Sequence, residues 1–280
     1  MSDLPLIEFQ QVSYAYPGSD RVRESPALTE IDLQIRQGEY ITLLGHNGSG
    51  KSTLARHCNA LLTPERGQVV VAGMDTRETT CQRRIRDIVG MIFQQPDNQI
   101  IATIVEDDVA WALSVRGLPG ELIAERVNEA LHAVSIAHLR DQSPQRLSGG
   151  QRQRLAIADV LALRPRCIIA DEATAQLDPL SRQEIVALLH RLHREYGLTI
   201  IHVTHLLEEA IQSERVIIME RGRLVMQGTP MMIFSDLDRL RALKLVAPAP
   251  LELAARLRAA GFSIAPSALT EEAIAQELVP

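Results

Sequence analysis

Hydrophobic and polar residues alternate in the first part of the chain and then change period. The stretches IEFQQVSYAY and LTEIDLQI alternate, which is typical of half-buried antiparallel strands. Residues 40–44 form a continuous apolar run that ends at Gly45, and from Ser52 to Leu62 apolar residues recur at helical spacing. The sequence therefore predicts a strand, a glycine loop and a helix, after which RGQVVVAGMD resumes strand character.

The second half of the chain mixes helical patterns with short apolar runs. The pattern is helical from about residue 96 to residue 162. Two fully apolar runs follow, residues 167–170 and 199–204, and a helical stretch separates them, which predicts parallel strands buried between helices. The pattern predicts an α/β fold with an N-terminal antiparallel β-subdomain, an inserted α-helical subdomain at about residues 95–162 and a small C-terminal helical appendage over residues 235–280.

Composition and charge narrow the classes of function. The chain has 280 residues, with 29 Lys and Arg against 35 Asp and Glu, so its net charge is −6 and nucleic acid is not an expected partner. No apolar run reaches the 18 or so residues that cross a bilayer, and the start MSDLPLIEFQ does not resemble an export signal. We expect a chain that does not span a membrane.

The cysteines and the paired histidines do not suggest a disulfide framework or a zinc site. The three cysteines are an odd number without a C-x-x-C pair, which favours a reducing cytosol. His190 and His193 stand three apart on a predicted helix that is rich in charge, so we expect them on a solvated face.

The sharpest motif is a complete G-x-x-x-x-G-K-S between a predicted strand and a predicted helix. Glycines let backbone N–H groups converge on phosphate oxygens, and the start of the helix adds positive potential. Lys51 is expected to reach the β and γ phosphates, and Ser52 to ligate Mg²⁺. The motif consists of Gly45, His46, Asn47, Gly48, Ser49, Gly50, Lys51 and Ser52.

A second apolar strand ends in two acids, Asp171 and Glu172. Asp171 is expected to hold Mg²⁺ through water. Because successive strand residues point in different directions, Glu172 is aimed differently and can act as the general base for the attacking water. Without the phosphate loop, two solvated acids at a strand end would be the better interpretation.

A third motif, Leu147-Ser148-Gly149-Gly150-Gln151, supplies another anion site at the start of a helix. A single nucleotide has no use for both sites within one compact core, since they open different helices about a hundred residues apart. Two copies arranged head to tail would solve this, with Ser148, Gly149 and Gly150 of one copy closing over the γ-phosphate held by Lys51 of the other.

With these motifs the sequence resembles the ATP-binding cassette ATPases over roughly residues 6–234, which implies a P-loop NTPase core and one cassette domain over residues 1–234. The resemblance implies ATP and Mg²⁺ as ligands. It implies catalytic roles for Glu172, His205 and Gln94, and metal contacts from Ser52, Gln94 and Asp171. It implies nucleotide contacts from Tyr16 (with Tyr14 as the competing choice), Gly45, Asn47, Gly48, Ser49, Gly50, Lys51, Ser52, Thr53, Ser148, Gly149, Gly150, Gln151 and Asp178. The chain departs from the family at Ala173, where proline is common.

The finer resemblance is to the energy-coupling factor (ECF) type of cassette ATPase, carried by GHNGSGKSTLARHCNALL, FQQPDNQIIATIVEDDVAWAL and the proline-linked tail. It implies a motor subunit that drives uptake of a micronutrient, a vitamin or a metal ion, from the cytoplasmic face of the membrane. The implied partners are a second ATPase subunit (self or paralogue), a transmembrane coupling subunit and a substrate-binding membrane subunit.

The stretch from Gln95 to Leu113 is expected to shape a groove for short helices of the membrane partner. The candidate contact residues are Ile100, Ile101, Val109 and Trp111. For each of them the alternative is a place in the hydrophobic core of the helical subdomain. The alternative functions are the ATPase of another ABC importer class, a non-transport ABC ATPase, and a nucleotide-dependent regulator without turnover.

Overall fold

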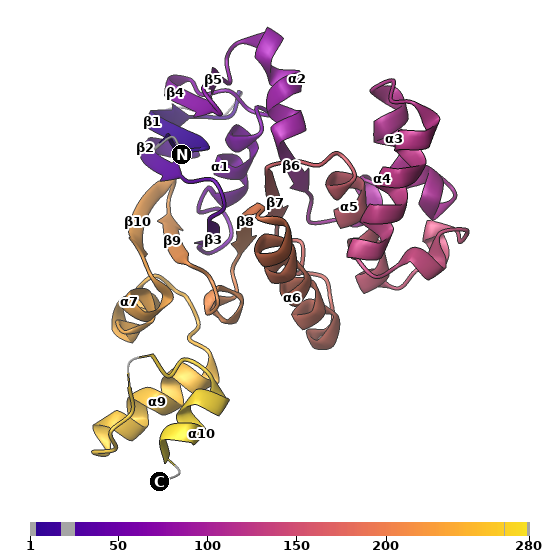
Figure 1. Ribbon diagram of the computed structural model, residues 1–280. Coiled ribbons are helices and arrows are strands. Elements are labelled where there is room, and N and C mark those ends of the chain that lie inside the picture. The colour runs from indigo at the N-terminus through magenta and orange to yellow at the C-terminus, as the bar shows by residue number, and fades with distance from the viewer. Residues whose placement is uncertain (1–3, 18–25, 266, 279–280) are drawn as a thin grey trace.

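The computed structural model describes residues 4–17, 26–265 and 267–278. Two β-sheets form the centre of the main body, and helices cover them, as Figure 1 shows. A helical arm extends to one side, and the last two helices project from the end of the body that carries α7 (Pro230–Phe234). The predicted α/β architecture is confirmed.

The N-terminal sheet is antiparallel, as its alternating sequence predicted. Ile7 pairs with Ile35 and Phe9 with Leu33, so the buried residues of neighbouring strands share one face. The order of its strands is β2 (Leu28–Ile35), β1 (Ile7–Tyr14), β4 (Arg66–Val71) and β5 (Met74–Asp75).

The second sheet holds the apolar runs of the sequence. Its strands are parallel except for the edge strand β10, which is antiparallel to β9. The elements packed on its faces bury β3, β6, β7 and β8 completely, which explains the apolar runs that the sequence shows at β3, β7 and β8. The order is β10 (Arg223–Gly228), β9 (Arg215–Glu220), β3 (Tyr40–Leu44), β8 (Thr199–Thr204), β7 (Cys167–Asp171) and β6 (Val89–Ile92).

The helix after the glycine loop, α1 (Lys51–Cys58), is shorter than predicted. The chain leaves it at Asn59 and turns at Ala60, whose φ of 56° is left-handed and cannot continue a helix. The prediction that this helix runs to Leu62 was therefore wrong. Two further helices pack beside the strands, α2 (Thr79–Ile88) and α6 (Pro179–Tyr196).

The inserted helical region forms the arm in Figure 1. Val109, Leu131 and Leu155 belong to one apolar cluster that continues into the sheet. The helices of the arm are α3 (Val105–Val115), α4 (Gly120–Ala133) and α5 (Gly149–Leu161), with short 3₁₀ turns at Pro96–Asn98, Ala137–Leu139 and Pro144–Arg146.

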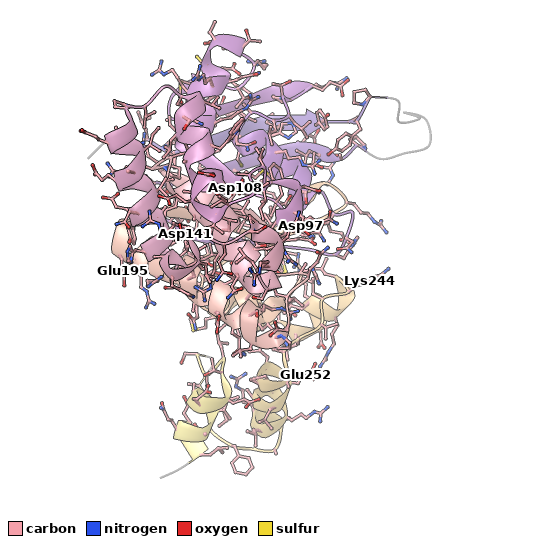
Figure 2. The ribbon with its side chains drawn as sticks, turned by 90° about the vertical axis from the view of Figure 1, so that its right-hand side faces the viewer. Asp97, Asp108, Asp141, Glu195, Lys244 and Glu252 are labelled. Atoms are coloured by element: carbon pink, nitrogen blue, oxygen red, sulfur yellow. The ribbon has the colours of Figure 1, made fainter. Side chains whose placement is uncertain are left out.

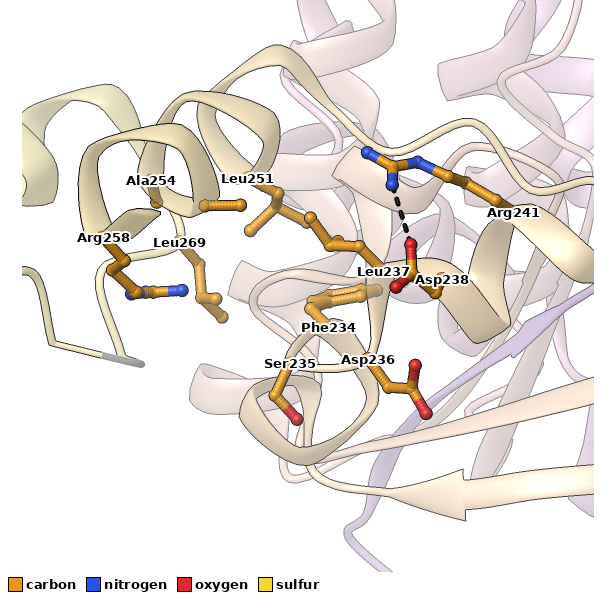
Figure 3. Close-up of a pocket in the computed structure, with 11 residues that line it drawn as sticks. Phe234, Ser235, Asp236, Leu237, Asp238, Arg241, Leu251, Ala254, Arg258 and Leu269 are labelled. Atoms are coloured by element: carbon orange, nitrogen blue, oxygen red, sulfur yellow. Dashed lines mark hydrogen bonds and ion pairs between the residues drawn. The ribbon is translucent and has the colours of Figure 1, made fainter. Parts of the chain in front are cut away.

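The C-terminal tail is helical, as predicted. Its helices after α7 are α8 (Leu237–Ala242), α9 (Ala249–Ala259) and α10 (Glu271–Leu278). Leu240, Leu245 and Leu251 pack in one apolar cluster with Leu44 and Ile218 of the sheet, so the first part of the tail shares the core of the main body. A cavity of about 280 Å³ lies between α8 and α9, lined by Phe234, Leu251 and Leu269 among others (Figure 3).

His190 is buried, so the expectation of a solvated histidine face was wrong for this residue. Its ring stacks on Tyr40 with centroids 4.1 Å apart, and only 6% of the residue is exposed. His193 packs edge-on against the same ring. Among the residues described here, no helix combines the length and the apolar character needed to cross a bilayer.

Candidate functional site

The glycine loop connects β3 to α1, as predicted. At Gly50 the backbone has φ of 103°, and a Cβ there would lie 2.6 Å from the carbonyl oxygen of Ala27. Only glycine fits this position, and the tight turn leaves the first N–H groups of α1 facing outward. The loop is therefore built to present backbone donors to an anion.

Lys51 opens α1 and folds back over the loop. Its Nζ donates hydrogen bonds to the carbonyl oxygens of Gly45 (2.8 Å) and His46 (3.2 Å), and it lies 3.6 Å from Oε1 of Glu172. Burial lowers the pKa of Lys51 from its ordinary value, while the charge of Glu172 and its hydrogen bond oppose that shift. The ammonium is thus held over the loop by carbonyl oxygens and a carboxylate.

The end of β7 meets the start of α1. Oγ of Ser52 donates a hydrogen bond of 2.8 Å to Oδ1 of Asp171. Burial raises the pKa of Asp171, and the hydrogen bond from Ser52 opposes the rise. The hydroxyl and the carboxylate therefore place two oxygen atoms side by side, and oxygen is the ligand type that Mg²⁺ prefers.

Glu172 lies beside Asp171 but points elsewhere. Its backbone has φ of 50°, a left-handed conformation that is uncommon outside glycine, and its N–H donates to the carbonyl oxygen of Val203 at 3.0 Å. Its Oε2 is 3.9 Å from Nδ1 of His205. This turn brings Glu172, the general base predicted from the sequence, next to His205, the other predicted catalytic residue.

A cavity of about 260 Å³ collects half of the predicted nucleotide residues. Gln94 and Glu172 reach it from β6 and β7, and the glycine loop supplies the remaining wall. We call this group the phosphate cluster; its members are Asn47, Gly48, Ser49, Gly50, Lys51, Ser52, Thr53, Gln94 and Glu172.

Tyr16 lies at the edge of the phosphate cluster. Its hydroxyl is hydrogen-bonded to Oγ1 of Thr53 at 3.2 Å, and 41% of the residue is exposed. Tyr14 instead packs edge-on against His57 and against the core of the N-terminal sheet. Of the two aromatic candidates, Tyr16 is the one with an accessible ring near the loop.

The remaining predicted residues form a second group at the starts of α5 and α6, which we call the signature cluster. Ser148 caps α5, with Oγ accepting from the N–H of Gln151 and its own N–H donating to Oε1 of Gln151. Asp178 caps α6 by accepting from the N–H of Ser181 at 3.0 Å. A Cβ on Gly150 would lie 3.1 Å from Oγ of Ser181, so the two helix starts are neighbours.

The two clusters are separate within one chain. None of the described residues that line the cavity of the phosphate cluster comes from the signature cluster. Helix α1 contacts β4, β7 and β8, whereas α5 contacts α3, α4, α6 and β6. Figure 1 shows β6 and β7 between α1 and α5.

Sequence reasoning missed several groups that surround these clusters. Asp97, labelled in Figure 2, forms an ion pair of 3.1 Å with Arg152 on α5. Glu209 is buried behind His205 and faces His202 at 3.2 Å. Only the position of Glu209, shortly after His205, could have drawn attention to it, because Arg182 and Thr174, which face it, are distant in sequence.

Comparisons with known proteins identify the family of the chain. A family model described as "ABC transporter" matches residues 28–175. The energy-coupling factor transporter ATP-binding protein EcfA1 of Symbiobacterium thermophilum is 49% identical over 98% of this chain and 96% of that protein.

Two solved structures are also similar. The structure of cbiO1 from Clostridium perfringens, described as part of the ABC transporter complex cbiONQ, has a TM-score of 0.78 and 34% identity, covering 90% of this chain and 99% of that one. A dimeric ATP-binding cassette, MJ0796, bound to ADP and Pi, has a TM-score of 0.71 and 31% identity, covering 80% and 98%. This chain therefore belongs to the ABC transporter family, as an ATPase of the energy-coupling factor type.

Proposed function

We propose that this chain is the ATP-hydrolysing motor of an ECF-type importer, coupling ATP binding and hydrolysis in a head-to-tail pair of ATPase subunits to uptake of a micronutrient, a vitamin or a metal ion. The observation that carries the proposal is the separation of the phosphate cluster from the signature cluster. Each cluster is half of an anion site, and neither is complete by itself.

The phosphate cluster binds the triphosphate of ATP. The N–H groups at the start of α1 and the ammonium of Lys51 supply positive potential, and the carbonyls of Gly45 and His46 aim that ammonium. The exposed ring of Tyr16 stacks on the adenine.

The residues present fit a magnesium ion. Ser52 and Asp171 are joined at 2.8 Å, and Gln94 lines the same cavity, so a hydroxyl, a carboxylate and an amide converge on one side of the loop. A bound Mg²⁺ would offset the charge of the phosphate oxygens.

Glu172 acts as general base. It is held 3.6 Å from Lys51 and 3.9 Å from His205, so its carboxylate lies between the group that binds the phosphates and the histidine that contacts the γ-phosphate. In this position it accepts the proton of the attacking water.

The signature cluster of one subunit closes over the phosphate cluster of the other. Because Gly149 and Gly150 open α5, their N–H groups and the dipole of the helix stabilise negative charge from the side opposite Lys51. The second subunit is either another copy or a paralogue, since this chain carries the residues of both halves.

The membrane partner docks beside the arm. Ile101 is 66% exposed and Trp111 51% exposed, whereas Val109 is fully buried and Ile100 packs against the core, so only Ile101 and Trp111 of the four candidates are available for contact. The adjoining Asp97–Arg152 pair links this surface to α5, which carries the signature cluster. Movement at the membrane surface and closure of the dimer are thus mechanically connected.

The test is purification of the tagged full-length chain from detergent-solubilised membranes of its host. We expect it to bring down membrane proteins with several spanning segments, and we expect Trp111→Asp to lose them while keeping ATP hydrolysis. Tyr196→Asp, an exposed aromatic at the far end of α6, is the matched control and should retain them. Recovery of ribosomal proteins would favour a non-transport ABC ATPase, and recovery of a transporter of different architecture would favour another importer class.

A further inference from the structure

Glu209 is a buried carboxylate that the proposed mechanism has not used. It lies in a 3₁₀ turn, Leu207–Ala210, that follows His205, and only 4% of the residue is exposed. A buried carboxylate is costly without close partners, so its surroundings decide what it does.

Donor groups from three functional segments surround this carboxylate. Nε2 of His202, on the strand that ends before His205, lies 3.2 Å from Oε2. Nε of Arg182, in the first turn of α6, lies 3.9 Å from Oε1. Nε2 of His202 is therefore at hydrogen-bond distance from the carboxylate, whereas Nε of Arg182 falls short of it.

The hydroxyls of two threonines complete the surroundings. Burial raises the pKa of Glu209, but His202, Thr204 and Thr174 lower it by more, so its pKa falls below the ordinary value and the group is an anion. Thr204 directly precedes His205, and Thr174 follows Glu172 by two residues. The carboxylate therefore faces the segments that carry both the general base and the histidine.

The other nitrogen of His202 fixes the orientation of its ring. Nδ1 is hydrogen-bonded to the hydroxyl of Tyr40 at 3.2 Å. The ionised carboxylate of Glu209 can only accept hydrogen bonds, so the nitrogen that faces it must be the donor. Nε2 then carries the hydrogen that points at Glu209.

We propose that Glu209 is a positioning residue for ATP hydrolysis and that the group it positions is His205. Its carboxylate links the segment of His205 to helix α6 through Arg182. The first residue of α6 follows Asp178. This inference rests on the proposed function. Asp178 belongs to the signature cluster, which meets the other subunit, so contact between subunits shifts α6 relative to Glu209 and thereby moves His205 toward or away from Glu172.

The distances suit such a role. The gap of 3.9 Å between Arg182 and Glu209 exceeds a hydrogen bond by about 1 Å, so a small displacement of α6 makes or breaks the contact. Because Glu209 is buried and Arg182 is half-buried, solvent screens this interaction less than one at the surface. Glu208 also faces Arg182, at 3.5 Å, but its side chain is 57% exposed and its interaction is screened.

The test compares Glu209→Gln with Glu208→Gln in the full-length chain. We expect Glu209→Gln to bind ATP within about twofold of wild type, since the phosphate cluster is untouched, and to lower kcat about 10-fold or more through misplacement of His205. Glu208→Gln should keep both values within about twofold. Unchanged kcat in Glu209→Gln, or equal losses of ATP affinity and kcat, would overturn the inference.

A second variant keeps the test decisive if Glu209→Gln folds poorly. Arg182→Gln, at a more exposed position, should also lower kcat while sparing ATP affinity, and the double variant should be no slower than the slower single variant because both changes break one connection. Multiplicative losses in the double variant would contradict the connection. If wild type itself shows no ATP hydrolysis, the proposed function fails rather than this inference.

Discussion

Ser52 and Asp171 are 119 positions apart in the sequence, yet Oγ of Ser52 donates a 2.8 Å hydrogen bond to Oδ1 of Asp171. The contact joins the start of α1 to the end of β7. Both strands that lead to these residues, β3 and β7, pair with β8, so the parallel sheet brings their carboxyl ends to one edge. The proposed magnesium site depends on this arrangement of strands.

Ser52→Ala is expected to raise the Mg²⁺ concentration for half-maximal ATP hydrolysis by about 10-fold or more, because one oxygen ligand is lost and the buried Asp171 loses a hydrogen bond. The measurement is a Mg²⁺ titration of ATP hydrolysis. Ser114→Ala, an exposed serine on α3, is the control and should behave as wild type. An unchanged titration for Ser52→Ala would remove Ser52 from the metal site.

Lys51→Ala should weaken ATP binding by about 100-fold, since a buried ammonium aimed by two carbonyl oxygens is lost. Isothermal titration calorimetry measures the affinity directly. The chain has only one other lysine, Lys244, which is exposed, and Lys244→Ala should bind ATP like wild type. Equal affinity in wild type and Lys51→Ala would contradict the phosphate-loop assignment.

The glycine loop and the two acids after β7 were predictable because their signals are local. A turn that requires glycine at Gly50, and an apolar run followed by acids, are visible in a few consecutive residues. The start of α1 lies in the same short segment, so its predicted role in binding phosphate also followed from local sequence.

Other features depend on tertiary contacts that no local pattern carries. β6 and α2 escaped prediction because VGMI is too short to be distinctive and TTCQRRIRDI is mostly polar. His190 appeared solvated because its neighbours are charged, but it stacks on Tyr40, which is 150 positions away. Glu209 is defined by partners from β8 and α6 and from the segment after β7, so only the folded chain reveals it.

The buried His190 predicts a loss of stability at low pH. Burial, with smaller effects from the nearby His202 and Arg194, lowers its pKa from 6.5 to about 4, so between these values the unfolded chain binds the proton and the folded chain does not. The free energy of unfolding should therefore fall as pH drops from 6.5 to 4, with a contribution of up to about 3 kcal/mol.

His190→Phe keeps the stacked ring on Tyr40 and removes the titration. Melting temperatures measured from pH 7 to pH 4 should fall less steeply for this variant than for wild type. His132→Phe, at an exposed histidine on the arm, is the comparison and should follow wild type. Parallel curves for all three proteins would exclude His190 as the source of acid sensitivity.

Glu172→Gln should retain ATP binding and lower ATP turnover by about 100-fold or more, because the amide cannot accept a proton from water. With hydrolysis blocked, the ATP-bound pair of subunits should accumulate. Steady-state phosphate release measures turnover, and Glu195→Gln on the exposed end of α6 (labelled in Figure 2) is the control. Near-normal turnover in Glu172→Gln would remove this residue from the mechanism.

The most direct test of the shared site is the molecular mass of the Glu172→Gln protein in the presence of ATP. Light scattering measures this mass for the variant by itself and for the variant mixed with any ATPase paralogue that co-purifies with the chain. The chain has a mass of 31.0 kDa, so ATP should convert it to a species of about twice that mass. Adding Ser148→Arg should leave ATP binding intact and keep the protein monomeric, because the arginine blocks closure at the start of α5. An ATP-dependent dimer that survives Ser148→Arg, or full hydrolysis by a strict monomer, would contradict the account.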